Sequence, residues 1–176
     1  FVVITSIQIG PSSPTTNQTT TAETEETFLY LFITGDAQGA IDGSVTEEGH
    51  EGAITVIKYT HGMYIAHSGL TVGKRVHEAF TITKEIDKAS PKLAEALITQ
   101  ENLHVELQFY HLEGAIKTKY YTITLENATI ISILSYAPTG QTSSRHMEEI
   151  SFTYGKIIWS YVGGASSSDT TTSDIP

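Results

Sequence analysis

Apolar and polar side chains alternate without a break from Leu103 to Tyr110. Successive side chains of a β-strand point to opposite faces of its sheet, so this period is typical of a strand that buries one face. The same alternation recurs at 121–125 and 150–154. Runs rich in β-branched and aromatic residues add four more candidates, at 28–34, 53–59, 76–83 and 129–136. The sequence therefore predicts at least seven strands.

One window departs from this β pattern. Ser90 is suited to cap a helix, Pro91 is suited to its first position, and helix-forming residues follow as far as Ile98. Leu93, Ala94 and Leu97 are spaced so that they share one helical face. We therefore predict a mainly β (α+β) fold, an antiparallel two-sheet β-barrel or sandwich with one short flanking α-helix.

The chain of 176 residues is of a size for which one hydrophobic core is usual, and its composition changes at both ends. Residues 1–10 form a short strand-like segment with apolar residues, and the sequence opens on Phe1 rather than Met, which leaves open whether a leader preceded it. Residues 11–27 are rich in Ser and Thr and are predicted to be a linker. Residues 28–162 are the predicted β domain, and 163–176 are a predicted flexible tail.

Composition excludes several classes of function. Ten basic residues stand against 20 acidic residues, and the resulting net charge of -10 disfavours binding to nucleic acid. No apolar run approaches the length of a membrane-spanning helix, so membrane insertion is not expected. The absence of cysteine removes disulfides, thiolate metal sites and cysteine nucleophiles.

Catalytic and metal-binding patterns are missing as well. The seven histidines show no spacing typical of metal ligands, and surface or loop positions are the expectation for them. Glu47, Glu48 and Glu51 surround His50, but the neighbouring glycines favour a solvated loop over an acid–base site. No nucleophile elbow, phosphate-binding loop or dinucleotide fingerprint is present. We predict no catalytic residue, no cofactor and no metal.

A resemblance to a known family is carried by Asp87, Lys88, Ala89, Ser90 and Pro91, followed by the predicted helix. This phrase resembles the haemolysin-coregulated protein (Hcp) family of type VI secretion. The step from Gly49 through His50, Glu51 and Gly52 into a strand, and the segment 148–159, resemble the same family in order and spacing, over about residues 28–162.

The resemblance implies a β-barrel with a helix on its side and subunits that form rings, which stack into a hollow tube pushed from the cell by a contracting sheath. It also implies effectors carried inside the tube. Assembly rather than catalysis is then the expected function. The matching positions are candidate subunit contacts, each with a purely structural turn or cap as the alternative: His50, Glu51, Asp87, Lys88, Ser90 and Pro91.

The segment before residue 28 departs from the family pattern, because family members usually begin near Phe28. An apolar strand on a tether tends to pair with a sheet edge. The linker can span roughly 55 Å, which is enough to reach a neighbouring subunit. We predict that the segment adds to the next subunit's sheet, as a donor strand does in pili, with folding back on its own barrel as the alternative. The candidate contacts are Phe1, Val2, Val3, Ile4, Ile7 and Ile9.

Three readings of function follow. The leading one is a non-enzymatic structural subunit that assembles with itself into rings and a tube or filament, resembling the Hcp tube protein; a pilus-like extracellular filament joined by donor strands is a variant of it. The second is a monomeric carrier or adaptor for a secreted effector, and the third a small hydrolase. The expected partners are further copies, with effectors and sheath or spike components as additions. The expected location is secreted or extracellular, with assembly beginning in the cytoplasm under the family route.

Overall fold

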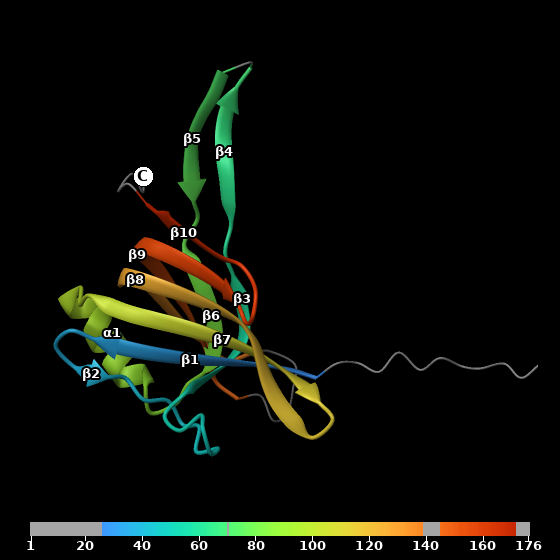
Figure 1. The fold of residues 1–176 in the computed structure, drawn as a ribbon. Helices are drawn as coiled ribbons and strands as arrows, with labels where there is room; N and C mark the ends of the chain where they lie inside the picture. Colours follow the sequence, from blue (N-terminus) through green and yellow to red (C-terminus); the bar gives the residue numbers. More distant parts are fainter. Residues whose placement is uncertain (1–25, 70, 139–144, 172–176) are drawn as a thin grey trace, which may run out of the picture.

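The computed structural model describes residues 26–69, 71–138 and 145–171. Figure 1 shows the strands and the helix α1 in chain order. Their bounds are β1 Thr27–Gly35, β2 Gly39–Ala40, β3 Ile54–Thr60, β4 Met63–Ser68, β5 Thr71–His77, β6 Phe80–Glu85, α1 Ser90–Thr99, β7 Leu103–Glu113, β8 Ile116–Tyr136, β9 Met147–Tyr161 and β10 Ser166–Thr170. The strands predicted from alternation and β-rich composition are all present, although their ends differ.

The strand pairings form a closed circuit. β9 pairs with β6, β6 with β3, β3 with β1, β1 with β7, β7 with β8, and β8 pairs again with β9, all antiparallel. β2 and β10 attach to this circuit at β1 and β9, while β4 and β5 form a separate two-stranded sheet. The prediction of an antiparallel β-barrel with a flanking helix is confirmed.

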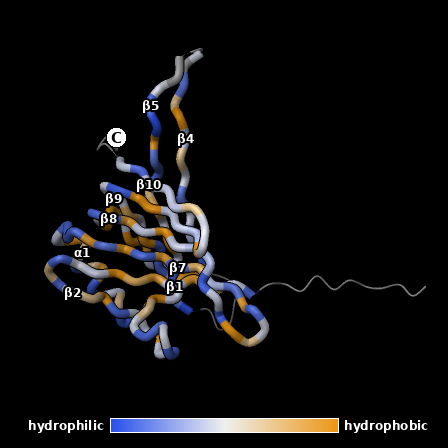
Figure 2. The backbone as a smooth tube through the Cα atoms, in the orientation of Figure 1, coloured by the Kyte–Doolittle hydropathy of each residue, from blue (hydrophilic) through white to orange (hydrophobic). Residues whose placement is uncertain are grey.

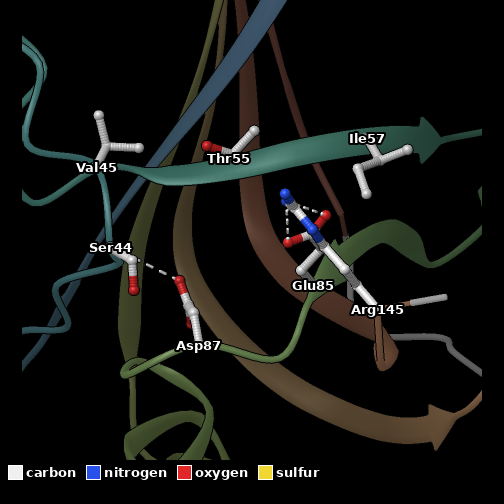
Figure 3. Close-up of a pocket in the computed structure, with 7 residues that line it drawn as sticks. All are labelled: Ser44, Val45, Thr55, Ile57, Glu85, Asp87 and Arg145. Atoms are coloured by element: carbon white, nitrogen blue, oxygen red, sulfur yellow. Dashed lines mark hydrogen bonds and ion pairs between the residues drawn. The ribbon is translucent and has the colours of Figure 1, made fainter. Parts of the chain in front are cut away.

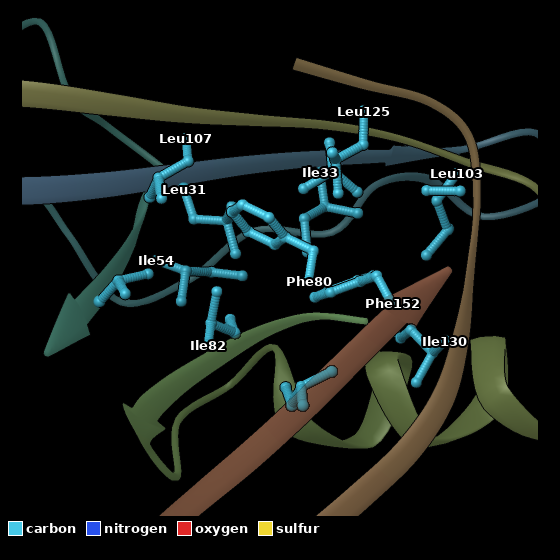
Figure 4. Close-up of a cluster of buried hydrophobic side chains, with 14 of the residues drawn as sticks. Leu31, Ile33, Ile54, Phe80, Ile82, Leu103, Leu107, Leu125, Ile130 and Phe152 are labelled. Carbon is cyan, nitrogen blue, oxygen red and sulfur yellow. The ribbon is translucent and has the colours of Figure 1, made fainter. Parts of the chain in front are cut away.

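The core lies inside this circuit. Phe80 and Phe152 stand opposite each other on β6 and β9, both with no exposed surface. The inward side chains of β1 and β7, including Leu31 and Leu107, pack into the same cluster (Figure 4). α1 packs against β8 and buries Leu93 and Ala96. One face of the helix is therefore buried. Of the three residues predicted to share that face, Leu93 is fully buried, whereas Ala94 and Leu97 are only partly buried.

Four predicted segments differ in the structure. The run 76–83 is divided, because β5 ends at His77 and β6 begins at Phe80, where the chain turns back into the barrel. The two segments 121–125 and 129–136 belong to one strand, β8, of 21 residues. Ser166–Thr170 forms β10 on β9, although 163–176 was expected to be a flexible tail. Backbone hydrogen bonds to β9 hold this strand and need no apolar side chains, so composition alone did not reveal it.

Candidate functional site

A buried lysine organises the loop that carries the family resemblance. The Nζ of Lys84 donates to Oε1 of Glu148 and to Oδ1 of Asp87, each at 2.7 Å, and to the carbonyl oxygen of Glu85 at 2.7 Å. The Lys84 side chain is 1% exposed. Its three donors are thus all used inside the subunit, which is the condition for burying an ammonium group.

Asp87 and Ser90 complete this cluster. Asp87 Oδ1 also accepts from the backbone N–H of Ala89 at 3.0 Å, and Ser90 Oγ donates to Glu148 at 2.6 Å while accepting from the N–H of Asp87 at 3.0 Å. The prediction of Ser90 as the helix cap is wrong, because Ala89 holds that position and makes no side-chain cap. Asp87 and Ser90 therefore shape the entry to α1 from within, whereas Lys88 and Pro91 are exposed and stay predicted contact residues.

A shallow hollow of about 280 Å³ lies beside this loop (Figure 3). Arg145 Nη1 donates to both carboxylate oxygens of Glu85 at 2.8 Å. Asp87 Oδ2 accepts from the N–H of Ser44 at 3.3 Å. Among the described residues, each charged group that lines the hollow therefore has a partner within the subunit: Glu85 and Arg145 bond each other, and Asp87 bonds Lys84.

His50 lies in a second cluster, which fixes the loop before β3. Its ring stacks on Tyr30 at 4.4 Å between centroids and meets the edge of Tyr110 at 4.7 Å. The Nζ of Lys117 contacts Glu47 Oε2 at 2.6 Å, and that hydrogen bond holds the pKa of the Glu47 carboxyl below its ordinary value. The expectation of a solvated loop is wrong for His50, whose side chain is only 11% exposed. It holds for Glu47, which is exposed although it is paired with Lys117, and for Glu51, which is exposed and accepts from the N–H of Gly49 at 2.9 Å.

A third cluster joins strands that are distant in the sequence, and we call it the histidine relay: His61, Tyr154, His77, Asp169 and Arg75. Tyr154 Oη lies 2.6 Å from His61 Nε2 and 2.9 Å from His77 Nδ1. His77 Nε2 lies 3.0 Å from Asp169 Oδ2, and Arg75 Nη2 donates to Asp169 Oδ1 at 2.6 Å. Burial raises the pKa of the Tyr154 hydroxyl, so this group is protonated.

With both histidines neutral, one arrangement of protons satisfies the relay. A carboxylate only accepts hydrogen bonds, so His77 Nε2–H donates to Asp169. His77 Nδ1 then accepts from the Tyr154 hydroxyl, whose oxygen accepts from His61 Nε2–H. The expectation of surface histidines is wrong here, since the His77 side chain is only 6% exposed. Sequence reasoning missed the relay because its members lie up to 108 residues apart, from His61 to Asp169.

The relay makes the stability of the protein depend on pH. Burial, with a smaller contribution from the nearby His77, lowers the pKa of His61. An unfolded histidine titrates near pH 6.5, so the unfolded chain takes up this proton first as the pH falls. The stability linked to neutral His61 is therefore present above about pH 6.5 and lost below it. We expect the Tm to be lower at about pH 5 than at about pH 8 by calorimetry, and His61→Gln to reduce that difference. An unchanged pH dependence in the variant would contradict this account.

β4 and β5 form an arm that projects from the barrel, and we refer to this hairpin as the arm (Figure 1). Three consecutive residues of β4 are half exposed, with Met63 at 49%, Tyr64 at 53% and Ile65 at 52%. Figure 2 shows this apolar stretch on the projecting strand. Among the described strands, β4 and β5 pair only with each other. The relay holds its base, because His61 precedes β4 and both Arg75 and His77 belong to β5.

Three further candidate features remain: a metal site, a membrane-spanning helix and the contacts of the first segment. Among the described residues no group of three or more His, Cys, Asp or Glu side chains could hold a metal ion. The helix of the described chain is not long and apolar enough to cross a membrane. The candidate contacts of the first segment, Phe1, Val2, Val3, Ile4, Ile7 and Ile9, lie outside the described residues.

Comparison with known proteins shows to which family this fold belongs. The family model described as "Type VI secretion system effector, Hcp" matches residues 30–161. The "Major exported protein" of Pseudomonas aeruginosa is 39% identical over 159 residues, which cover 80% of this chain and 92% of that relative.

Solved structures agree with this match. The secreted protein Hcp3 of Pseudomonas aeruginosa is 38% identical, with a TM-score of 0.70 over 84% of this chain and all of that one. Hcp1 from the E. coli EAEC 042 pathovar is 32% identical, with a TM-score of 0.74 over 81% of this chain and 97% of that one. This chain belongs to the Hcp family of type VI secretion, and it is an exported structural subunit of a ring-forming and tube-forming protein rather than an enzyme.

Proposed function

We propose that copies of this chain join through the arm, which leaves one barrel and rests on a different surface of the next copy. The carrying observation is the half-exposed apolar run Met63, Tyr64 and Ile65 on a two-stranded sheet that stands apart from the barrel. A contact between two different surfaces is heterologous, and it closes into a ring or continues into a stack, depending on the rotation between copies. This is the symmetry that a tube requires.

Two physical arguments support the arm as the connector. An isolated two-stranded hairpin is marginally stable in water, and its open edges expose unpaired backbone groups. Packing against another copy would satisfy both needs. In addition, the histidine relay fixes the base of the arm to β9 and β10, so less conformational entropy is lost when the arm is bound.

Charged substitutions on the arm test this proposal. Tyr64→Asp combined with Ile65→Asp places two carboxylates in the interface, and we expect the rings or tubes of the parent protein to be lost in electron microscopy and light scattering. Ile98→Asp is the matched control, because Ile98 on α1 is 81% exposed and lies outside the arm. Circular dichroism should show that both variants are folded. Parent-like assembly by the arm variant, or an equal loss in the control, would contradict the role of the arm.

The same measurement separates the alternative readings. A parent protein that stays a single copy at all concentrations would favour the monomeric carrier. Secreted effectors and sheath or spike components stay predicted partners that rest on the family resemblance. The proposal for the arm concerns contacts between copies and does not depend on them.

A further inference from the structure

A groove runs between the arm and the last strand of the barrel. Its volume is about 310 Å³, and its lining comes from β4, β5, β9 and β10. Met63, Tyr64, Ile65 and Trp159 give it an apolar floor, while Ser167 and Ser168 form its rim. Arg75 and Asp169, which also line it, are paired with each other at 2.6 Å. The groove is therefore apolar and electrically neutral.

β10 offers an open sheet edge beside this groove. It is the end strand of the sheet order and pairs with β9 alone among the described strands, from Ser166 opposite Ser160 to Thr170 opposite Lys156. Natural edge strands are commonly protected by Lys, Pro or inward charges. β10 contains neither Lys nor Pro, and Asp169 is engaged in the relay. The outer backbone groups of this strand can therefore accept another strand.

The chain itself contains a segment that fits this site. Residues 1–9 carry no charge, and their odd positions place Phe1, Val3, Ile7 and Ile9 on one face of an extended strand. We propose that residues 1–9 of a neighbouring copy add to the outer edge of β10 and lay this apolar face on Met63, Ile65 and Trp159. This proposal rests on the proposed function, in which the arm connects copies. It adds that residues 1–9 of the neighbouring copy are the segment that binds beside the arm.

Strand addition supplies affinity and specificity from different sources. The backbone of the added strand would hydrogen-bond to β10, and alternate side chains would enter the groove. The absence of charge in residues 1–9 matches a groove whose two charged side chains neutralise each other. A charged segment would leave an ion without a partner on the apolar floor, which is costly.

The length and origin of the linker favour a neighbouring copy as the acceptor. Residues 11–26 can extend roughly 50 Å. A return to the same sheet would need a connection of only a few residues. β1 begins with Thr27 opposite His111, beside the turn between β7 and β8. Figure 1 shows that the chain enters β1 at this end of the barrel, which is not the end that carries the tip of the arm. A tether of this length lets the segment reach the next barrel in a ring or stack.

Cysteine trapping tests the proposal on the full chain, because the protein has no cysteine of its own. Val3→Cys, Ile4→Cys and Thr5→Cys, made singly, sample both faces of the segment. Each is mixed with a second full-length variant, Ser167→Cys, and oxidised gently. We expect a disulfide-linked pair of chains for at least one combination, several-fold above the pair formed with Ala115→Cys, an exposed control in the turn between β7 and β8.

Trp159 supplies a second measurement, because it is the only tryptophan of the chain and it lines the groove. Val3→Asp should shift its fluorescence to longer wavelength by exposing the groove to water, whereas Thr20→Asp in the linker should leave it unchanged. Disulfide trapping at control level together with unchanged Trp159 emission would overturn the proposal. So would a doubly substituted chain, with Ile4→Cys and Ser167→Cys, that cross-links only within itself. If rings still form in these cases, the proposed role of the arm in assembly stands and only the binding of residues 1–9 is contradicted. A parent protein that never assembles would instead contradict the proposed role of the arm.

Discussion

Replacing Lys84 by methionine is expected to lower the free energy of unfolding by about 3–5 kcal/mol. The ammonium group of Lys84 is the shared partner of Glu148 and Asp87, each at 2.7 Å, and the Glu148 side chain is only 4% exposed. Methionine fills a similar volume but leaves two carboxylates facing each other without a cation. Urea denaturation followed by circular dichroism measures the loss.

Lys88→Met is the matched control for this prediction. Lys88 is exposed, so its substitution should change stability by no more than about 0.5 kcal/mol. A small effect of Lys84→Met, comparable to that of the control, would show that the buried cluster is not what holds the loop before α1. The same cluster also explains the sequence at 87–91, because Asp87 pairs with the buried ammonium group of Lys84 and Ser90 hydrogen-bonds to Glu148 in the same cluster.

Truncating Phe152 to alanine should cost about 3–5 kcal/mol. The ring has no exposed surface and faces Phe80 across β6 and β9, at the centre of the closed circuit of strands. Alanine removes most of the side chain, and the surrounding strands cannot collapse onto the cavity because each is held by two neighbours. Thermal and urea denaturation of the variant give the measurement.

Phe152→Leu separates cavity formation from loss of aromatic character. Leucine retains much of the volume, so its cost should be well below that of alanine. Equal losses in the two variants would show that the ring contributes through its specific contacts instead of its volume. Ser151→Ala, on the neighbouring position of β9, controls for substitution in the same strand.

The three polar clusters have one property in common that bears on function. Each uses its charged groups within the subunit: Lys84 with Glu148 and Asp87, Lys117 with Glu47, and Arg75 with Asp169. Such clusters hold loops and the arm in defined positions on the barrel. Their geometry suits a subunit that presents shaped surfaces to its neighbours, in accordance with the structural role of the Hcp family.

Much of the fold could be predicted from local pattern. The strand β7 was visible in the alternation from Leu103 to Tyr110, and its buried and exposed positions follow that alternation. The helix was visible as a departure from β composition. Both signals arise between residues close in the chain, where the period of side chains along a strand or helix decides which face is buried.

The candidate site was predictable only in part. Residues 87–91 were singled out through a family resemblance, but their partner Glu148 and the burial of Lys84 were not foreseen. The arm was missed because residues 63–77 show no clear alternation, and its exposure depends on the absence of a covering strand in the described structure. Local sequence does not determine which strands pair with one another in a barrel.

Local sequence is enough to establish that this chain forms a β-rich domain with one flanking helix, and it contains the phrase that identifies the family. Those properties depend on side-chain periodicity and on contiguous residues. The folded structure was needed to reveal that β8 pairs with β9, that the serine-rich residues 166–170 form β10, and that five distant side chains form the relay. These outcomes depend on backbone pairing and on convergence of distant residues, which no local pattern encodes.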